Sequence, residues 1–347
     1  MISVPLSALD LLPVQKGTAA RDALKASVAV ASHIEQLGYR RLWFAEHHSR
    51  MADASCCPPV LVGQIAAKTS TLRVGSGGVM VPNHVPLTVA EQFATLDAFH
   101  PGRIDLGLGR GPGTIDENIA RALRRGAGPI TDLEYQQDVR TVLNLFDPDI
   151  GTPLLPGYRP ALQPWLLSSS AAGGELAGEF GLPVAIAHHI RPHNTEATLA
   201  AYRESFRPSR WLSEPYVLLC VLTVCADTDD RAHYVAGPNE VVRAHLAERK
   251  LSELLTPEHA AAYDYTATQQ QTVHQLRESQ AQGSPETVTR RLTDLVRATG
   301  ADELMLYTPI YDLSDRLRSF ELVATHVAPA SANRNCSDQR DDRSALL

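Results

Sequence analysis

The sequence predicts a single (β/α)8 TIM barrel over residues 1–328. Short apolar segments alternate with amphipathic helical patterns along almost the whole chain, an order typical of a parallel sheet covered by helices. Eight such segments occur, which is the number of strands that a closed parallel barrel needs. Residues capable of chemistry collect at six of these segments. The length of 347 residues is enough for one large core.

The eight predicted strands are mostly continuous apolar segments. Parallel strands that are buried on both faces have this pattern, whereas half-exposed strands alternate between apolar and polar residues. The segments are residues 4–9, 41–45, 72–81, 104–109, 165–168, 184–187, 217–225 and 303–308.

Helices are predicted between the strands. Apolar residues recur at helical spacing over residues 24–37, and Gly38 follows as a stop signal. The same pattern covers residues 89–99. Ser284 and Pro285 provide an N-cap and a proline at the first helical position, and they predict the start of the last crossover helix.

Three segments depart from the regular repeat. Residues 147–164 are rich in proline and glycine and predict a loop before the fifth strand. Residues 227–283 are too long for one crossover, so they predict a helical insertion between the seventh strand and the last crossover helix, and a candidate lid. The polar and charged tail, residues 329–347, is expected to be disordered.

Composition and charge exclude several classes of function. The net charge is −7 and no dense basic run occurs, which argues against nucleic-acid binding. The longest apolar stretch, residues 216–226, is about half the length needed to span a bilayer. No signal peptide is recognisable, and the five cysteines lack the spacing of a disulfide framework or zinc site. A cytoplasmic protein is therefore expected.

The residues at the strand ends predict one functional site. In a (β/α)8 barrel, catalysis takes place at the carboxyl ends of the strands. These ends carry Asp10, Glu46, His47, His48, Gly77, Gly78, Arg110, Ser168, Ser169, Ser170, His188 and His189.

Two pairs of adjacent histidines lie among these residues. Neighbouring side chains on an extended strand point to opposite faces, so at most one of His47 and His48, and one of His188 and His189, should face the barrel interior. This spacing does not resemble a pair of metal ligands, and we expect no metal. Each histidine also has the simpler interpretation of a hydrogen-bonded surface group.

The fourth and fifth strand ends favour an anion. Arg110 lies in a glycine-rich stretch, residues 107–113, where a guanidinium and exposed backbone N–H groups suit a phosphate. The serines at 168–170 precede a helix, and they add donors at its N-terminus. Thr114 and Glu117 predict a capping box for a helix behind the turn. A flexible turn and structural serines remain the alternative interpretation.

The chain resembles the bacterial luciferase-like flavin monooxygenase family, from the first strand to about Pro329. It is most similar to the single-chain branch that contains an enzyme of mensacarcin biosynthesis. The matching segments are Leu37-Gly-Tyr-Arg-Arg-Leu-Trp-Phe-Ala-Glu-His-His48, Leu72-Arg-Val-Gly-Ser-Gly-Gly-Val-Met-Val-Pro82, Pro86-Leu-Thr-Val-Ala-Glu-Gln92, Pro101-Gly-Arg-Ile-Asp-Leu-Gly-Leu-Gly-Arg110 and Gly283-Ser-Pro-Glu-Thr-Val288.

The resemblance implies the chemistry and the partners. It implies reduced FMN supplied by a separate flavin reductase, and oxygen that adds to the flavin as a C4a-peroxide and is then transferred to a small organic substrate. An aromatic polyketide or another intermediate of secondary metabolism, as in antibiotic biosynthesis, is the substrate class of the branch. It also implies a homodimer through the helices after strands two and three, where residues 59–67, including Val60 and Ile65, form a candidate apolar surface.

The resemblance also implies roles for individual residues. His47 matches the catalytic histidine, Gly77 and Gly78 match a cis peptide under the isoalloxazine ring, and Arg110, Ser169 and Ser170 match contacts to the phosphate or ribityl chain. The expected substrate-side residues are Asp10, His188 and His189.

Two departures limit the resemblance. Luciferase has a cysteine where this chain has Gly109 and an acidic residue where it has Ser169, so light emission is not expected. Two other functions stay open: hydride transfer with the deazaflavin F420 on the same barrel, and flavin binding without catalysis.

Overall fold

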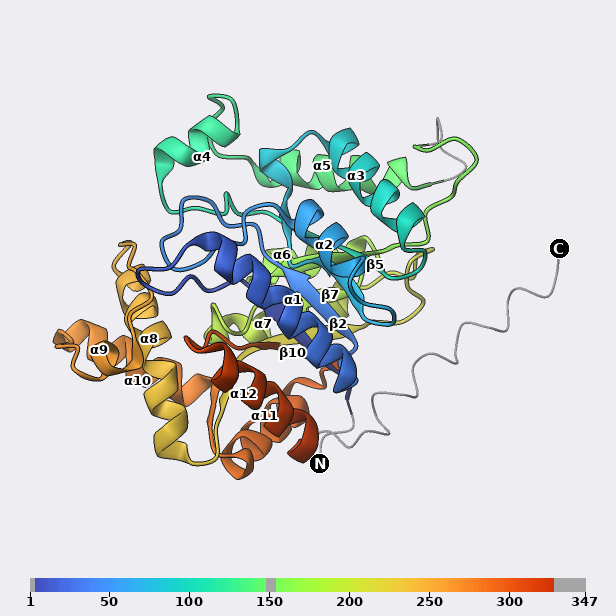
Figure 1. The fold of residues 1–347 in the computed structure, drawn as a ribbon. Coiled ribbons are helices and arrows are strands. Elements are labelled where there is room, and N and C mark those ends of the chain that lie inside the picture. Colours follow the sequence, from blue (N-terminus) through green and yellow to red (C-terminus); the bar gives the residue numbers. More distant parts are fainter. Residues whose placement is uncertain (1–3, 148–153, 328–347) are drawn as a thin grey trace.

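The computed structural model describes residues 4–147 and 154–327, and within them it forms a closed parallel barrel (Figure 1). Strand β10 pairs in parallel with both β1 and β8, which closes the ring and confirms the predicted eight-stranded barrel. The barrel strands are β1 (Leu6–Asp10), β2 (Arg41–Phe44), β3 (Arg73–Ser76), β5 (Ile104–Gly109), β6 (Gln163–Ser168), β7 (Val184–Ile186), β8 (Val217–Cys225) and β10 (Glu303–Tyr307). The tail at 329–347 lies outside the described residues.

Helices surround the barrel, and none of those in the described ranges is long and apolar enough to cross a membrane. They are α1 (Ala20–Gln36), α2 (Pro58–Ala66), α3 (Pro86–Phe99), α4 (Glu117–Leu123), α5 (Asp132–Leu145), α6 (Ala171–Glu179), α7 (Thr195–Ser205), α8 (Asp229–Ala247), α9 (Pro257–Ala261), α10 (Ala267–Ser279), α11 (Pro285–Thr299) and α12 (Leu313–His326), with short 3-10 turns η1 (Val81–Asn83) and η2 (Pro192–Asn194).

The predicted helix signals are found at the helix ends. Helix α1 ends just before Gly38, whose φ of 78° lies in the left-handed region that glycine adopts without strain. Helix α11 begins after Ser284, whose hydroxyl accepts a hydrogen bond from the Thr287 N–H, and Pro285 follows at the first helical position. Both predictions are confirmed.

The sheet differs from the prediction in three places. The single strand expected at 72–81 is two strands, β3 and β4 (Val79–Met80), separated by a cis peptide bond between Gly77 and Gly78. A short strand that we did not predict, β9 (Ala281–Gly283), pairs with β8. The loop expected over 147–164 ends earlier, because β6 already begins at Gln163; residues 148–153 are not described.

The segment 227–283 is mostly helical, as predicted, and ends in the short strand β9. It contains α8, α9 and α10, which lie together at one side of the barrel (Figure 1). Helices α8 and α10 pack against each other and against the barrel mouth. The insertion therefore forms part of the wall around the open end of the barrel.

The barrel interior is filled at the amino ends of the strands. There, the Arg41 guanidinium pairs with Asp105 and Glu303, at 2.7 Å each, and all three side chains are buried. Above this ionic layer, Trp43 and Trp165 pack edge to face with ring centroids 5.1 Å apart. This filling closes one end of the barrel, so a ligand can enter only at the carboxyl ends of the strands.

Candidate active site

A cavity of about 1730 Å³ opens at the carboxyl ends of the strands. Its walls come from the segments after β1, β2, β5, β6, β7 and β10, together with α8 and α10 of the insertion. Of the residues predicted from the sequence, it is lined by His47, Gly77, Arg110, Ser168, Ser169, Ser170 and His189.

His47 follows β2 and is held by its own backbone. Its N–H donates to the Ser55 carbonyl at 2.8 Å. The ring Nδ1 lies 3.4 Å from Asp53 Oδ1, although the angles are not those of a hydrogen bond. Arg50 donates to the other oxygen of this carboxylate at 3.3 Å. The imidazole thus lines the cavity with a carboxylate beside it.

The neighbouring His48 belongs to a different cluster, which is centred on the buried Glu46. The Glu46 carboxylate lies 2.9 Å from ring nitrogens of His48 and His84, and it accepts hydrogen bonds from Met80 N–H at 2.9 Å and Asn83 Nδ2 at 3.0 Å. Burial opposes ionisation of Glu46, but these donors outweigh it and lower the pKa to about 2. These hydrogen bonds connect the end of β2 to β4 and η1, beside the cavity.

Bare backbone forms one part of the cavity wall. A Cβ atom on Gly77 would lie 3.0 Å from Leu9 Cδ1 and 3.1 Å from Trp43 Cβ. A Cβ atom on Gly78, which does not itself line the cavity, would lie 2.8 Å from the Gly107 carbonyl oxygen. Glycine at these positions therefore lets the backbone pack closely against Leu9, Trp43 and the Gly107 carbonyl, and Gly77 presents bare backbone to the cavity.

Arg110 and the serines lie at adjacent strand ends, after β5 and β6. The Arg110 guanidinium is half-exposed and pairs with Asp132 Oδ1 at 2.5 Å. Ser170 caps α6, since its hydroxyl accepts from the Gly173 N–H at 3.4 Å. A guanidinium next to a helix N-terminus suits a phosphate or another oxyanion.

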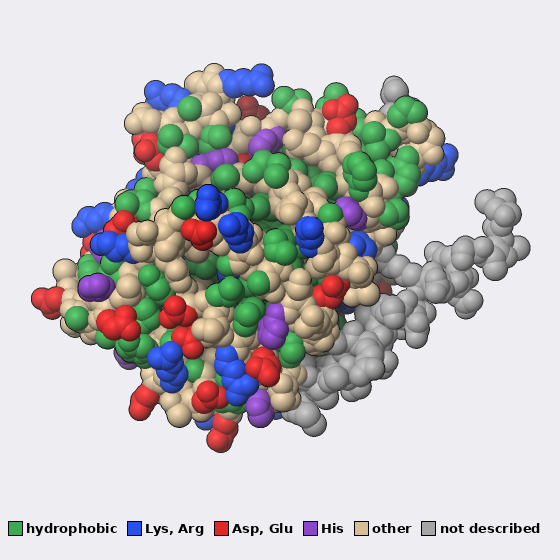
Figure 2. Space-filling view, viewed as in Figure 1, with side chains coloured by type: hydrophobic (Ala, Val, Ile, Leu, Met, Phe, Trp, Pro, Cys, Tyr) green, Lys and Arg blue, Asp and Glu red, His purple; other side chains and the backbone are tan. Residues whose placement is uncertain are grey.

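Helix α4 adds further positive charge at this side of the cavity. Arg121 and Arg124 line the cavity, and basic side chains gather over α4 in Figure 2. The N-cap of α4 is Asp116, which accepts from the Asn118 N–H at 2.8 Å. Our prediction of a Thr114 capping box is therefore wrong: Thr114 Oγ1 instead accepts from the Asp116 N–H at 3.1 Å.

The two histidines after β7 point in different directions, and only one of them lines the cavity, as predicted, although they lie in a turn and not on an extended strand. His189 lines the cavity, and burial and the nearby Arg243 lower its pKa to about 3, so its ring is neutral near pH 7. His188 instead hydrogen-bonds Thr195 Oγ1 at 2.8 Å and the Ser279 carbonyl at 2.9 Å, outside the cavity lining.

Asp10 is also outside the cavity lining. Its fully buried carboxylate accepts from the Leu12 N–H at 2.7 Å and pairs with Arg316 at 2.7 Å. Arg316 itself does line the cavity. Any influence of Asp10 on a ligand would therefore pass through Arg316.

The sequence prediction missed a group of cavity residues on the insertion and at the end of β10. These are Asn239 and Arg243 on α8, with Tyr307 and Thr308. A signal for the α8 residues exists: Asn239 and Arg243 follow Val235 and Ala236 on the buried stripe of the helix. The pattern does not reveal which part of the barrel that stripe covers.

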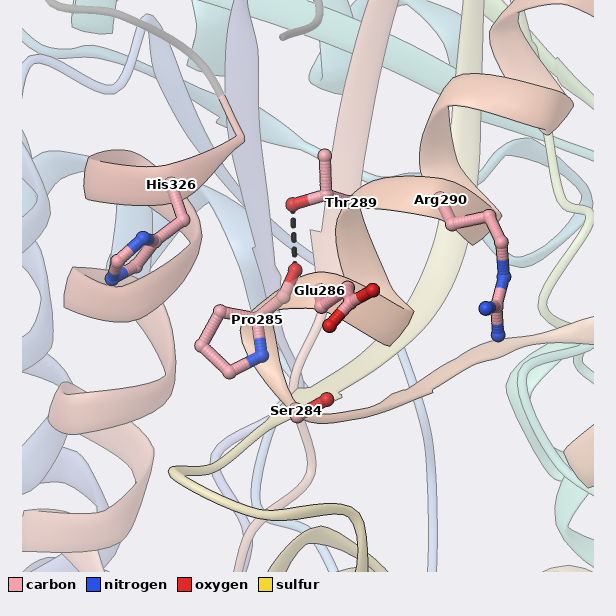
Figure 3. Close-up of a pocket in the computed structure, with 6 residues that line it drawn as sticks. All are labelled: Ser284, Pro285, Glu286, Thr289, Arg290 and His326. Atoms are coloured by element: carbon pink, nitrogen blue, oxygen red, sulfur yellow. Dashed lines mark hydrogen bonds between the residues drawn. The ribbon is translucent and has the colours of Figure 1, made fainter.

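A second, smaller hollow of about 590 Å³ lies between the start of α11 and the end of α12 (Figure 3). It shares no lining residue with the larger cavity. The first turn of α11 there is already capped by Ser284, and Thr289 Oγ1 donates to the Pro285 carbonyl at 2.6 Å. We assign this hollow no chemistry. Its lining residues are Ser284, Pro285, Glu286, Thr289, Arg290 and His326.

Comparison with known proteins identifies relatives over nearly the whole chain. A family model described as luciferase-like monooxygenase matches residues 7–303. A luciferase-like monooxygenase of Escherichia coli (strain K12) is 38% identical over 323 residues, covering 92% of this chain and 96% of the relative. YvbT of Bacillus subtilis (strain 168) is 40% identical over 323 residues, covering 92% and 95%.

Solved structures share the fold. The structure of apo-MsnO8, a mensacarcin-type monooxygenase, matches this chain with a TM-score of 0.84. The two sequences are 33% identical, and the match covers 94% of this chain and 99% of MsnO8. The oxygenating constituent of 3,6-diketocamphane monooxygenase of Pseudomonas putida, in complex with FMN, has a TM-score of 0.69 at 17% identity, covering 94% and 98%. An F420-dependent secondary alcohol dehydrogenase has a TM-score of 0.66 at 15% identity, covering 95% and 99%.

Proposed function

Because this chain belongs to the luciferase-like monooxygenase family, we propose that it uses reduced FMN and molecular oxygen to oxygenate a small organic substrate. In this proposal a separate flavin reductase supplies the reduced FMN, as the resemblance to the family implies. This proposal gives a cofactor and a co-substrate to the flavin-dependent monooxygenase activity of the family.

The cavity fits FMN at both ends of that molecule. Arg110, Ser169 and Ser170 would hold the phosphate, through a guanidinium and the start of α6. The exposed backbone at Gly77 would support the isoalloxazine ring. Small-molecule pockets commonly have volumes of about 300–1,000 Å³. The 1730 Å³ of this cavity leaves room for a substrate beside the flavin.

The protein's own residues would position the reactants and move a proton. Reduced FMN supplies the electrons with which oxygen is activated. His47 reaches the cavity from β2 and can take up or return a proton at its imidazole. His189 is neutral near pH 7, so it can orient a ligand by hydrogen bonding but does not add charge. The apolar side chains of Leu9, Leu11 and Ala45 limit access of water.

One observation carries this proposal: a single cavity joins His47, Gly77 and Arg110. The test is to mix the protein with anaerobically reduced FMN, add oxygen, and follow flavin reoxidation, oxygen use and hydrogen peroxide yield. His47→Ala should change the reoxidation rate at least about tenfold, since a positioned acid–base group contributes about 10²–10⁴. The affinity for FMN should stay within about twofold, as the phosphate contacts are intact.

His274→Ala is the matched control, because His274 is an exposed histidine on α10 that does not line the cavity. If His47→Ala and His274→Ala both oxidise reduced FMN as the wild type does, His47 is not the catalytic group. Flavin binding without any effect on oxygen consumption would favour the non-catalytic alternative.

The F420-dependent alternative is tested in the same protein. It is supported by the fold shared with an F420-dependent dehydrogenase. Turnover of an alcohol with F420 under strictly anaerobic conditions would establish hydride transfer and overturn the oxygenase proposal. No turnover there, together with oxygen consumption with reduced FMN, supports the oxygenase.

We further propose a cellular location, a substrate class and an oligomeric state. Free Cys56, Cys57, Cys220 and Cys225 suit a reducing cytoplasm. The substrate is proposed to be an intermediate of secondary metabolism, such as an aromatic polyketide in antibiotic biosynthesis, because MsnO8 shares 33% of its residues with this chain. A homodimer through α2 and α3 is the proposed assembly, because exposed apolar side chains occur on both helices.

A further inference from the structure

Arg243 carries a positive charge into the cavity without a carboxylate partner. It lies on α8 and lines the cavity, where its guanidinium donates to the His189 carbonyl at 2.9 Å. Within the described ranges no carboxylate approaches it within ion-pair distance. Burial lowers the pKa of this guanidinium. Even a partly buried cation is stabilised by a counter-ion, which favours a ligand that supplies the negative charge.

Two other residues that line the cavity carry hydrogen-bond donors without a partner. Asn239 precedes Arg243 by four residues, so both lie on one face of α8. Asn239 is 3% exposed, and its Nδ2 has no hydrogen-bond partner. Thr308, at the end of β10, is 1% exposed and its hydroxyl has no partner either. Both side chains line the cavity.

The acidic groups near this donor set are already paired. Asp10 forms an ion pair with Arg316 at 2.7 Å. Asp53 pairs with Arg50 at 3.3 Å and lies beside His47. Arg50 and Arg316 are thus matched, which leaves the charge of Arg243 uncompensated. The Tyr307 ring lies among these charges, and burial and Asp53 raise the pKa of its phenol.

This donor set is distinct from the proposed phosphate site. Arg110 follows β5, whereas Thr308 follows β10, and β5 and β10 are on opposite sides of the eight-stranded ring. Apolar side chains also line the cavity on the insertion and after β1, so the rest of a ligand bound there can contact hydrocarbon. The apolar residues on this side of the cavity are Leu11, Val242, Leu246, Leu254 and Leu276.

We propose that Arg243, Asn239 and Thr308 bind a carboxylate of the substrate, so that the substrate is an apolar organic acid. The guanidinium pairs with the carboxylate, and the amide and hydroxyl groups donate to its oxygens. The apolar body of the substrate then lies toward His47 and the flavin ring. This inference rests on the proposed function, for which it supplies the substrate class.

The test compares 2-naphthoate with 2-naphthamide, which have the same shape but differ in charge. Binding to the full-length protein is measured by calorimetry, with and without saturating FMN. The wild type should bind 2-naphthoate at least tenfold more tightly than 2-naphthamide, since a charged hydrogen bond contributes about 1.5–3 kcal/mol. Arg243→Met should abolish this preference and leave 2-naphthamide binding within about twofold, whereas Arg243→Lys should retain part of it.

Arg249→Met is the matched control, because Arg249 lines the same cavity but is exposed. It should keep the preference for the anion. Asn239→Leu should weaken 2-naphthoate binding and spare 2-naphthamide, and it replaces Arg243→Met if that variant does not fold. Equal binding of the two probes to the wild type overturns the inference, and so does a preference that survives in Arg243→Met.

FMN affinity, measured in the same variants, separates this inference from the proposed function. Loss of the naphthoate preference with unchanged FMN affinity supports a substrate carboxylate. If Arg243→Met weakens FMN at least tenfold and leaves the naphthoate preference intact, Arg243 belongs to the flavin site and the inference fails. If the protein binds no FMN but still prefers naphthoate, the proposed cofactor fails and the carboxylate site stands.

Discussion

At the scale of single residues, the proposed role of Arg110 predicts that the FMN phosphate and the Asp132 carboxylate compete for its guanidinium. Its guanidinium is 2.5 Å from Asp132, whose side chain is 80% exposed. Arg110→Met should weaken FMN binding about tenfold to a hundredfold, the range expected for a charged hydrogen bond. Asp132→Asn removes the competing carboxylate, so it should strengthen FMN binding. The gain should be at most about fivefold, because the exposed ion pair that is lost contributes only about 0–1 kcal/mol.

Fluorescence titration with FMN and with riboflavin checks this prediction. Riboflavin has no phosphate, so both variants should bind it as the wild type does. A variant that loses riboflavin as well as FMN has a damaged ring site instead. Equal loss with the two ligands would exclude Arg110 as the phosphate contact.

The sequence identified cavity residues on several segments that follow the barrel strands. Alternation on an extended segment agrees with the separation of His47 from His48, but His188 and His189 lie in a turn after β7, so their separation has another cause. Alternation could not place Asp10, because the side-chain direction at a strand end depends on how the chain leaves the strand. Here the Asp10 carboxylate accepts a hydrogen bond from the N–H of Leu12, which is two residues later in the chain.

At the scale of elements, the Glu46 cluster joins β2 to β4 and η1. In the folded protein the pKa of the Glu46 carboxyl is about 2, below the ordinary value of 4.5 for a glutamate. A depressed carboxyl pKa stabilises the folded state above the ordinary pKa, and this contribution is lost as the pH falls from 4.5 toward 2. Glu46→Gln should therefore be less stable than the wild type by about 1–3 kcal/mol at pH 7.

Urea unfolding of wild type and Glu46→Gln at several pH values measures this difference. It should shrink as the pH falls below 4.5. Glu91→Gln, on an exposed position of α3, should show little change at any pH. A difference that is independent of pH would mean that Glu46 stabilises the protein by packing alone.

The ionic layer at the amino ends of the strands gives a second prediction. Arg41 is 3% exposed and lies between Asp105 and Glu303, both fully buried. Arg41→Met removes the one buried cation that the two carboxylates share and leaves them only the less buried Arg73, 2.5 Å from Asp105, and Arg40, so it should cost about 3–5 kcal/mol. Arg40, 24% exposed and 3.7 Å from Glu303, is the control; Arg40→Met should cost about 1 kcal/mol or less.

Urea unfolding at pH 7 compares the two variants. A similar loss in both would place the stabilising contact at the Arg40 side of the layer. A loss below about 1 kcal/mol in Arg41→Met would show that the carboxylates accept protons at little cost.

Elements were predictable where burial on both faces leaves a long apolar pattern. Most of the barrel strands have this pattern, although β3 (Arg73–Ser76) does not, and helix ends with a cap or glycine were located from their own signals. Strand β9 (Ala281–Gly283) was missed, because three residues with a central glutamine carry no apolar run. On α2, Ile65 is 1% exposed and packs in the core, so our assignment of it to an apolar surface is wrong. A helix that is apolar on most sides does not reveal which side faces the barrel.

At the scale of the whole molecule, the barrel mouth and the proposed dimer surface use different parts of the chain. The mouth is built from strand ends and the insertion, whereas α2 and α3 lie on the outside of β2, β3 and β5. Flavin binding and assembly can therefore be perturbed separately. A variant on α2 or α3 that changes assembly should leave FMN affinity unchanged.

Val60 is the position at which we test the proposed dimer. It is 67% exposed on α2, and Leu87 and Phe99 on α3 are 46% and 75% exposed. Exposed apolar side chains on neighbouring helices favour an interface at this face. Val60→Asp would bury a carboxylate between protomers. The dissociation constant of the dimer should therefore increase at least about a hundredfold, which corresponds to about 2.7 kcal/mol.

Light scattering coupled to size-exclusion chromatography measures the mass of each variant over a range of concentrations. The wild type should elute as a dimer and Val60→Asp as a monomer with unchanged FMN affinity. Leu133→Asp places the same charge on α5, at a side chain that is 63% exposed, and it should remain a dimer. If Leu133→Asp dissociates and Val60→Asp does not, the interface includes α5 instead of α2. A monomeric wild type would exclude the dimer altogether.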